Sequence, residues 1–237
     1  MTLATTRLNR LPAAERGITI GDFLVPIAIG ERISERARHA ALIVVGALFI
    51  VLTANVALPL NGQTVSLLGE VRVTLPNSPV PITLQTLSVL LVGGALGFRR
   101  GFLSVALYLL IGLAFPVYAG GASGMHVFIS SSQGHWVLGA TGGYLLGFVV
   151  AGAIVGRLAE LGWDRHVGGA VSAMLIGDLI VYVVGVPYLM AATGMDLGTA
   201  LEKGAYPFLL WDLVKLAVAG ILFPIAWWIV GRGVGER

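Results

Sequence analysis

The chain has 237 residues, of which 57% are hydrophobic and 11% are charged. Soluble domains carry about 25% charged residues, so this composition excludes an ordinary soluble globular domain and indicates an integral membrane protein. The formal net charge of +3 is too small to indicate a nucleic-acid-binding protein, and the absence of cysteine excludes disulfides and thiolate metal sites.

The first 39 residues contain six arginines and four acidic residues. Their apolar stretch, ITIGDFLVPIAIG, is broken by Gly, Asp and Pro. A cleaved signal peptide needs an uninterrupted apolar core, so we predict instead a cytoplasmic arm over 1–39, with a short surface helix around ERISERARH. The membrane domain is expected over 40–231, and a short cytoplasmic tail over 232–237.

Apolar runs long enough to cross the hydrocarbon core of a bilayer, about 17–25 residues each, predict six transmembrane helices. Two of them are short, and Arg99 and Arg100 with their flanking glycines predict a tight turn between these two. We therefore predict an all-α integral membrane protein. The predicted helices lie at about 40–60, 80–97, 102–118, 139–157, 168–192 and 206–230.

The basic residues are distributed unevenly between the predicted loops. Twelve of the fifteen lie in the arm, the tail and two loops at 98–101 and 157–167, whereas only Arg72 and Lys203 lie in the opposite loops. Cytoplasmic loops carry the excess of Lys and Arg, so both termini are predicted to be cytoplasmic. The external loops are then 61–79, 119–138 and 193–205.

Glycines four residues apart recur along three of the predicted helices. Such small faces let helix backbones approach closely where lipid gives no hydrophobic drive for helices to associate. We predict helix packing as their main role, within a single compact membrane domain. The sets are Gly93/Gly97/Gly101, Gly139/Gly143/Gly147 and Gly152/Gly156.

Two opposite charges interrupt the sixth predicted helix, in the stretch FLLWDLVKLAVAG. Asp212 and Lys215 stand three residues apart, which places them on one face of the helix. A charged side chain near the bilayer centre costs about 2.5–3.5 kcal/mol, so such groups face an interior cavity or each other. The pair is either a self-neutralising packing element or part of a binding site that offers one acceptor and one cation.

Other polar groups lie in neighbouring helices. Gln85 and Thr86 stand near the start of the second helix, in PVPITLQTLSVLL, where an inter-helix hydrogen bond is the alternative role. The fourth helix begins with GATGGYLLGF, and Gly142 and Gly143 would let an anion approach the free N–H groups of its outward start. Asp178 in the fifth helix is either a pocket residue or an inter-helix hydrogen-bonding residue.

Five segments occur in order between about 79 and 220: VPITLQTLSVLLVGGALGFRRG, YLLIGLAFPVYAGG, TGGYLLGF, IVYVVGVPYL and the D-x-x-K of PFLLWDLVK. Together they resemble the BioY family, the biotin-specific S components of energy-coupling factor (ECF) transporters. The resemblance implies a six-helix, outward-opening subunit of a prokaryotic plasma membrane that binds biotin without a cofactor. It also implies a transmembrane T component and ABC-type ATPases as partners, and this sequence indeed has no phosphate loop of its own.

The resemblance also implies which residues bind the ligand. The family's D-x-x-K falls on Asp212 and Lys215, its LQT on Gln85 and Thr86, and its TGGY on Thr141, Gly142, Gly143 and Tyr144. This chain departs from the family at Ala140, where proline is frequent, at Trp211, where glycine is common, and in the length of the external loop that contains HVFISSSQGHWV. The first 39 residues lie outside the resemblance.

Biotin offers a ureido ring, a thioether ring and an aliphatic chain that ends in a carboxylate. Asp212 is expected to accept from ureido N–H groups, with Gln85 on the remaining edge and Lys215 at the carboxylate near Thr141. The reverse assignment, with Lys215 on the ureido oxygen, also fits. The aromatic side chains expected to wall the rings are Tyr108, Tyr118, Tyr144 and Trp211.

A strip of small residues on the first predicted helix is a candidate contact for a T component, as in the S components that the chain resembles. It consists of Gly46, Thr53 and Ala57, which are spaced to lie near one face of the helix. Internal packing is the alternative role.

Two other functions are possible from the sequence. Gly121–Gly124 matches the GxSG of rhomboid-type intramembrane proteases, in which the serine needs a histidine base. All four histidines fall in loops or at helix ends, so Ser123 is not expected to have such a base, and we predict no enzyme. A stand-alone secondary transporter would need a titrating carboxylate, for which Asp178 is the candidate. No metal site is expected, because His126 and His135 have no third ligand.

Overall fold

The computed structural model describes residues 17–24, 34–58, 60, 62, 64–67, 71–74, 77–132 and 135–235. These residues form a mostly helical protein. Within them, five helices are long and apolar enough to cross a membrane, which agrees with the predicted fold class. They are α4 (Glu35–Ala54), α5 (Gln85–Ala114), α6 (Gly142–Glu160), α7 (Val167–Thr193) and α9 (Tyr206–Gly235).

Helix α5 is two helical segments folded back on each other at Gly97. This residue has φ 83° and ψ 179°, a conformation outside the helical region that glycine adopts without a side-chain clash. The Gln85 side-chain amide donates to the Tyr108 hydroxyl at 2.8 Å, although a straight helix would separate these residues by about 35 Å. The second and third predicted helices therefore exist as an antiparallel pair, joined at the predicted turn. The number of complete membrane crossings stays a prediction.

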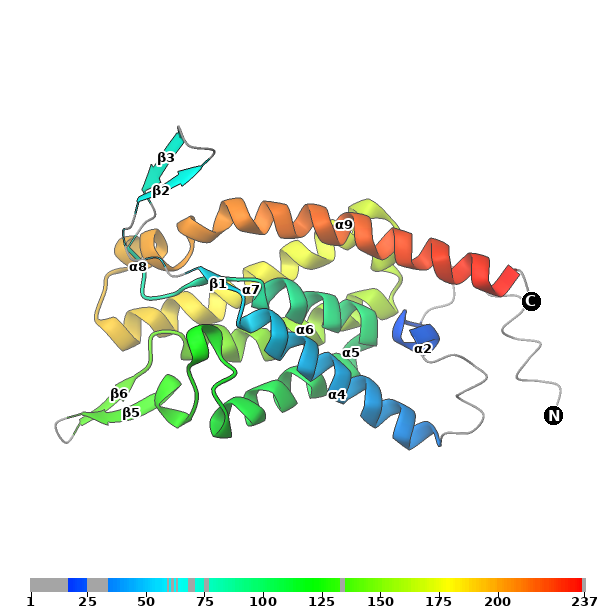
Figure 1. Ribbon diagram of the computed structural model, residues 1–237, viewed down its shortest axis with the longest axis horizontal. Helices are drawn as coiled ribbons and strands as arrows, with labels where there is room; N and C mark the ends of the chain where they lie inside the picture. Colours follow the sequence, from blue (N-terminus) through cyan, green and yellow to red (C-terminus); the bar gives the residue numbers. More distant parts are fainter. Residues whose placement is uncertain are drawn as a thin grey trace.

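The helices lie side by side and give the molecule two distinct ends (Figure 1). Helix α4 begins and helix α9 ends at one of them, beside the short helix α2 (Gly21–Leu24). Helix α8 (Leu197–Gly204) and the strand hairpins lie at the other. Both ends of the membrane domain therefore lie on one side, as predicted, while its orientation in the membrane stays a prediction.

The connections at the hairpin end contain short antiparallel strands, which the sequence reading did not anticipate. Strand β1 (Ala57–Leu58) pairs with β4 (Ile82–Thr83), with Ala57 opposite Thr83. Two hairpins extend outward from the helices: β2 (Thr64–Leu67) with β3 (Val71–Thr74), and β5 (Ile129–Ser132) with β6 (His135–Leu138). Short 3-10 helices span Ala119–Gly121 and Met125–Val127 between α5 and α6, and Trp163–Arg165 between α6 and α7.

The first long helix is shifted from its predicted position. The hydroxyl of Ser34 accepts from the backbone N–H of Ala37 and caps α4, so residues 35–39 form the beginning of this helix. At its other end α4 stops at Ala54, six residues before the predicted end. Much of the predicted arm lies outside the described residues. Of the proposed surface helix at 31–39, residues 34–39 are described, and residues 35–39 form the start of α4.

Residues 17–24 pack onto the end of the bundle at which α4 begins. Asp22 forms a 2.8 Å ion pair with Arg100 in the α5 turn, and Ile20 is buried. The Arg165 guanidinium donates to the Ile18 carbonyl at 3.1 Å and stacks 4.1 Å from the ring centre of Trp227. This part of the arm therefore joins the α5 turn to the end of α9.

Most of the glycines four residues apart lie in helix contacts, as predicted, whereas Gly139 lies before α6 and packs against the Val127 backbone of the preceding connection. A Cβ atom added at Gly93 would lie 2.4 Å from the Gly152 carbonyl oxygen, and one at Gly156 would lie 2.5 Å from the carbonyl carbon of Gly97. Helices α5 and α6 therefore touch backbone to backbone. Only a residue without a side chain permits this separation.

Candidate ligand-binding site

A pocket lies between the start of α5 and helices α6, α7 and α9. Its empty volume, including the part open to solvent, is about 700 Å³. Polar lining residues are Thr83, Gln85, Thr86, Thr141, Asp178, Tyr182 and Lys215. Apolar and aromatic lining residues include Val80, Tyr118, Tyr144, Leu145, Phe148, Val181 and Phe208.

The two charges of α9 form a buried ion pair, as their spacing predicted. The Lys215 ammonium lies 3.0 Å from Oδ1 of Asp212, and each side chain is less than a tenth exposed. Oδ2 of Asp212 accepts from the Tyr182 hydroxyl of α7. Lys215 lines the pocket, whereas Asp212 is not among the lining residues. Asp212 therefore holds the ammonium in place, and each of its oxygens already has a donor.

Asp178 presents the second carboxylate, from the middle of α7. It is 4% exposed and lines the pocket. Neither of its oxygens has a hydrogen-bond partner among the described residues. Buried carboxylate oxygens normally find donors, and one that lacks them beside a cavity is suited to receive donors from a ligand. Of the two roles considered for Asp178, the structure favours that of a pocket residue.

The LQT residues lie at the start of α5. Gln85 is buried and donates its amide nitrogen to Tyr108, which in turn donates to the Val117 carbonyl at 3.4 Å. Thr86 lines the pocket beside Gln85. Thus Gln85 both serves the inter-helix hydrogen bond named as its alternative role and faces the pocket.

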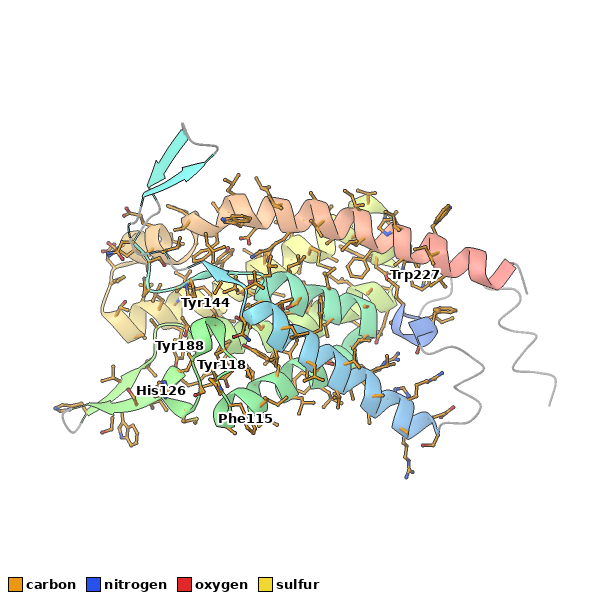
Figure 2. All side chains as sticks on the ribbon, viewed as in Figure 1. Phe115, Tyr118, His126, Tyr144, Tyr188 and Trp227 are labelled. Atoms are coloured by element: carbon orange, nitrogen blue, oxygen red, sulfur yellow. The ribbon has the colours of Figure 1, made fainter. Side chains whose placement is uncertain are left out.

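The aromatic residues divide into two groups. Tyr118 and Tyr144 line the pocket, and Figure 2 shows both near the hairpin end of the helices. The expectation that Tyr108 and Trp211 wall the rings is not supported. Tyr108 is fully buried behind Gln85, and Trp211 is 42% exposed in a lateral groove between the start of α5 and α9, which adjoins the pocket at Thr83 and Lys215.

The TGGY segment forms the start of α6. Thr141 and Tyr144 line the pocket, and the Tyr144 hydroxyl donates to the Gly204 carbonyl of α8 at 2.8 Å. Gly142 and Gly143 are not lining residues. A Cβ atom at Gly143 would lie 2.2 Å from Cβ of Tyr188, so these glycines let α6 pack against α7, not against a ligand.

Three aromatic lining residues were among those missed at the sequence level: Phe148, Tyr182 and Phe208. Tyr182 follows Asp178 by four residues, and Phe208 precedes Asp212 by four, so each shares a helix face with a recognised charge. This spacing was the available signal. Phe148 had none, because it is one apolar residue among many in α6.

The small-residue strip of the first helix is not one surface. Gly46 is buried, and a Cβ atom there would lie 2.7 Å from Oγ of Ser104. Thr53 donates to Oγ of Ser88 at 2.6 Å, and Ala57 lies outside the helix in β1. This placement favours the internal-packing alternative. It corrects the expectation that the three residues share one outer helix face.

Ser123 lies in the connection between α5 and α6, partly buried. Among the described residues no histidine is hydrogen-bonded to it. The ring of the nearby His126 (Figure 2) lies beside Gly124. A Cβ atom added at Gly124 would lie 3.2 Å from the Nδ1 atom of His126. The described geometry therefore offers no serine–histidine pair for the protease alternative.

Comparisons with known proteins agree with this architecture. The sequence profile of the BioY family matches residues 28–232. The chain is 34% identical over 151 residues to the biotin transporter BioY of Thermotoga maritima, covering 63% of this chain and 82% of that protein. It is also 34% identical over 158 residues to the biotin transporter BioY2 of Lactococcus lactis, covering 64% of this chain and 78% of that protein.

A solved structure shares the fold. It is the crystal structure of the S-component for biotin from an ECF-type ABC transporter, with a TM-score of 0.63 and 24% sequence identity. The match covers 81% of this chain and 93% of the other. Since the family profile spans most of the sequence, the chain belongs to the BioY family.

Proposed function

We propose that this chain is the S component that captures biotin from outside a prokaryotic plasma membrane for an ECF transporter. Membership of the BioY family supports this function, as do the several helices that can span a membrane. The observation that carries the proposal is the pocket, in which the unpaired Asp178 and the ammonium of Lys215 lie among aromatic rings. Biotin needs such a combination of polar groups and apolar walls.

The charges of the pocket support one of the two orientations of biotin beside Lys215. Asp178 and Asp212 already supply two carboxylates around one ammonium. The carboxylate of biotin, if placed there, would add a third negative charge in a site of low dielectric constant. The uncharged ureido ring avoids this repulsion, and its N–H groups supply the donors that Asp178 lacks. We therefore favour the assignment with Lys215 on the ureido oxygen.

The depth of these residues fits the same orientation. Lys215 is nine residues into α9 from Tyr206, or about 14 Å, whereas Thr141 lies at the first turn of α6. With the ureido ring beside Lys215, the aliphatic chain of biotin extends toward Thr141. The N-terminus of α6 carries the positive end of the helix dipole, which favours a carboxylate at that position.

Transport itself needs partners. The sequence contains no phosphate loop that would bind ATP. In the proposed function, ABC-type ATPases supply the energy for uptake, together with a transmembrane T component. In this arrangement the chain binds and carries biotin and is not an enzyme. Uptake by the isolated chain, in energised vesicles without T component or ATPases, would instead support the stand-alone secondary transporter.

Isothermal titration calorimetry of the detergent-purified chain tests the substrate. We expect biotin to bind, and thiamine and riboflavin, which lack a cyclic ureido group on an acidic aliphatic chain, to bind far more weakly. Preferential binding of either of these vitamins would refute the proposed function. Purification of the native complex, followed by identification of the co-purifying proteins and ligand, tests the partners.

A further inference from the structure

A second cavity lies at the other end of the bundle, where the first turns of α4 meet the α5 turn and the end of α6. Its empty volume, including the part open to solvent, is about 1240 Å³. Four basic side chains line it, with one acid: His39, Arg99, Arg100, Arg157 and Glu160. The basic-residue distribution assigns this end of the bundle to the cytoplasm.

The acidic groups near this cavity already have partners. Glu160 accepts from Arg157 at 2.9 Å through one carboxylate oxygen and from the backbone N–H of Phe98 at 2.9 Å through the other. Asp22 pairs with Arg100 at 2.8 Å. Positive charge therefore remains, because three arginines face two carboxylates.

Two of the arginines have unused donors. Arg99 is exposed and forms no ion pair with any described residue. The Nη1 atom of Arg100 is buried and has no hydrogen-bond partner within the described part of the chain. An oxygen-rich anion in the cavity would accept from both guanidinium groups. Phosphate oxygens suit this geometry, since arginine presents its donors as a planar fork.

The rest of the lining is apolar. Ile43 of α4 and Leu103 of α5 lie beside the basic groups, and Phe98 and Leu103 are each more than 40% exposed. Both helices run on from this end of the bundle as candidate membrane spans. A free phosphate ion or a soluble acidic peptide would leave these apolar walls unused. An amphiphile with a phosphate headgroup and acyl chains would contact both parts of the cavity.

We propose that this cavity binds an anionic phospholipid, with its phosphate between Arg99 and Arg100 and its acyl chains along Ile43 and Leu103. Basic pockets between membrane helices on the cytoplasmic side are suited to such headgroups. The bound lipid would join α4 to the α5 turn and the end of α6, at the end of the bundle farthest from the candidate biotin pocket. The proposal does not depend on the identity of the transported ligand.

Native mass spectrometry of the purified chain tests this site, with phosphatidylglycerol and phosphatidylcholine added at equal concentrations. We expect phosphatidylglycerol to be retained preferentially, and Arg99→Gln to lower its apparent affinity about fivefold, the usual effect of one basic residue at an anionic lipid surface. Lys203→Gln is the matched control, since it removes one positive charge at the opposite end of the bundle. It should leave lipid retention unchanged.

Further arms distinguish the source of the phosphate and guard against misfolding. Inorganic phosphate and glycerol phosphate should not displace the lipid at equal concentration; if either does, the cavity is an anion site and the lipid proposal is overturned. Retention of phosphatidylglycerol that is equal in the wild type and Arg99→Gln also overturns it. Unchanged thermal unfolding of Arg99→Gln shows that a loss of lipid is local.

Discussion

The ammonium of Lys215 lies 3.0 Å from the carboxylate of Asp212 on one face of α9, and Tyr182 of α7 donates to the other oxygen of that carboxylate. Asp212 therefore positions Lys215, whereas Asp178 has no donor among the described residues. We predict that Asp212→Asn lowers both Tm and biotin affinity, the latter about tenfold, because it leaves a buried ammonium without its counter-ion. Differential scanning fluorimetry and calorimetry measure the two effects.

The same substitution at Asp178 separates binding from folding. Asp178→Asn should lower biotin affinity at least tenfold without lowering Tm, since no internal hydrogen bond of the described structure is lost. Asp196→Asn is the matched control: Asp196 is exposed and caps α8, and asparagine caps helices equally well. Unchanged biotin affinity in Asp178→Asn would show that this carboxylate does not meet the ligand.

The contact between α5 and α6 yields a prediction about stability. Gly93→Ala would place a Cβ atom 2.4 Å from the Gly152 carbonyl oxygen, and neither backbone can move without displacing its helix. We expect a loss of about 1–3 kcal/mol in the free energy of unfolding, seen as a lower Tm. Gly168→Ala is the control, because nothing lies within 4 Å of a Cβ atom there. Equal Tm values for the two variants would contradict the close contact.

The orientation in the membrane can be tested by cysteine labelling, since the sequence contains no cysteine. Ser131 in β5 and Leu197 in α8 are exposed at the hairpin end, whereas His166 is exposed at the other end of the bundle. The three variants are Ser131→Cys, Leu197→Cys and His166→Cys. An impermeant maleimide added to intact cells should label the first two and not the third. Labelling of His166→Cys from outside would reverse the predicted orientation.

The helices were largely predictable from the sequence because bilayer thickness sets the length of an apolar run. The turn within α5 was predictable too, from the pair of arginines flanked by glycines. The limits of the first helix were not. The Ser34 cap moves its start into a charged segment, and the pairing of Ala57 with Thr83 ends it early. The cap and the strand pairing are local hydrogen-bonding arrangements that do not change the hydropathy of the segment.

The candidate site was predictable in composition but not in arrangement. Charges in apolar helices are rare enough to stand out, so Asp178, Asp212 and Lys215 were recognised individually. The sequence could not tell which carboxylate pairs with Lys215 and which faces the cavity, because this depends on how α7 and α9 are rotated against each other. Likewise, the lack of a side chain at Gly142 and Gly143 would allow either a ligand or Tyr188 to approach closely. Only the packing of α6 on α7 determines which of the two does so.

Asp164, in the connection between α6 and α7, predicts a pH dependence of stability. Burial raises the pKa of its carboxyl from 3.8 to about 6, although Trp227 donates to it at 2.7 Å. The folded protein therefore holds a proton that the unfolded chain releases. This stabilisation is complete below about pH 4 and is lost as the pH rises through about 6.

Asp164→Asn tests this dependence, because asparagine keeps an acceptor for Trp227 and does not ionise. Its Tm should match that of the wild type near pH 4 and exceed it above pH 6, by an amount that corresponds to at most about 3 kcal/mol. Unfolding curves at pH 4, 5, 6 and 7 provide the comparison. Parallel pH profiles for the two proteins would mean that Asp164 does not titrate in this range.

The orientation of biotin in the pocket gives the most direct test of the site. Lys215→Met keeps the apolar stem of the side chain and removes its ammonium. If Lys215 meets the ureido oxygen, the substitution weakens biotin and the neutral biotin amide by the same factor, about tenfold or more, since both ligands share the ureido ring. If Lys215 meets the carboxylate, the substitution weakens biotin strongly and the amide little. Calorimetric titration of both proteins with both ligands separates these outcomes, and we expect the first because a ligand carboxylate beside Asp178 and Asp212 would be repelled.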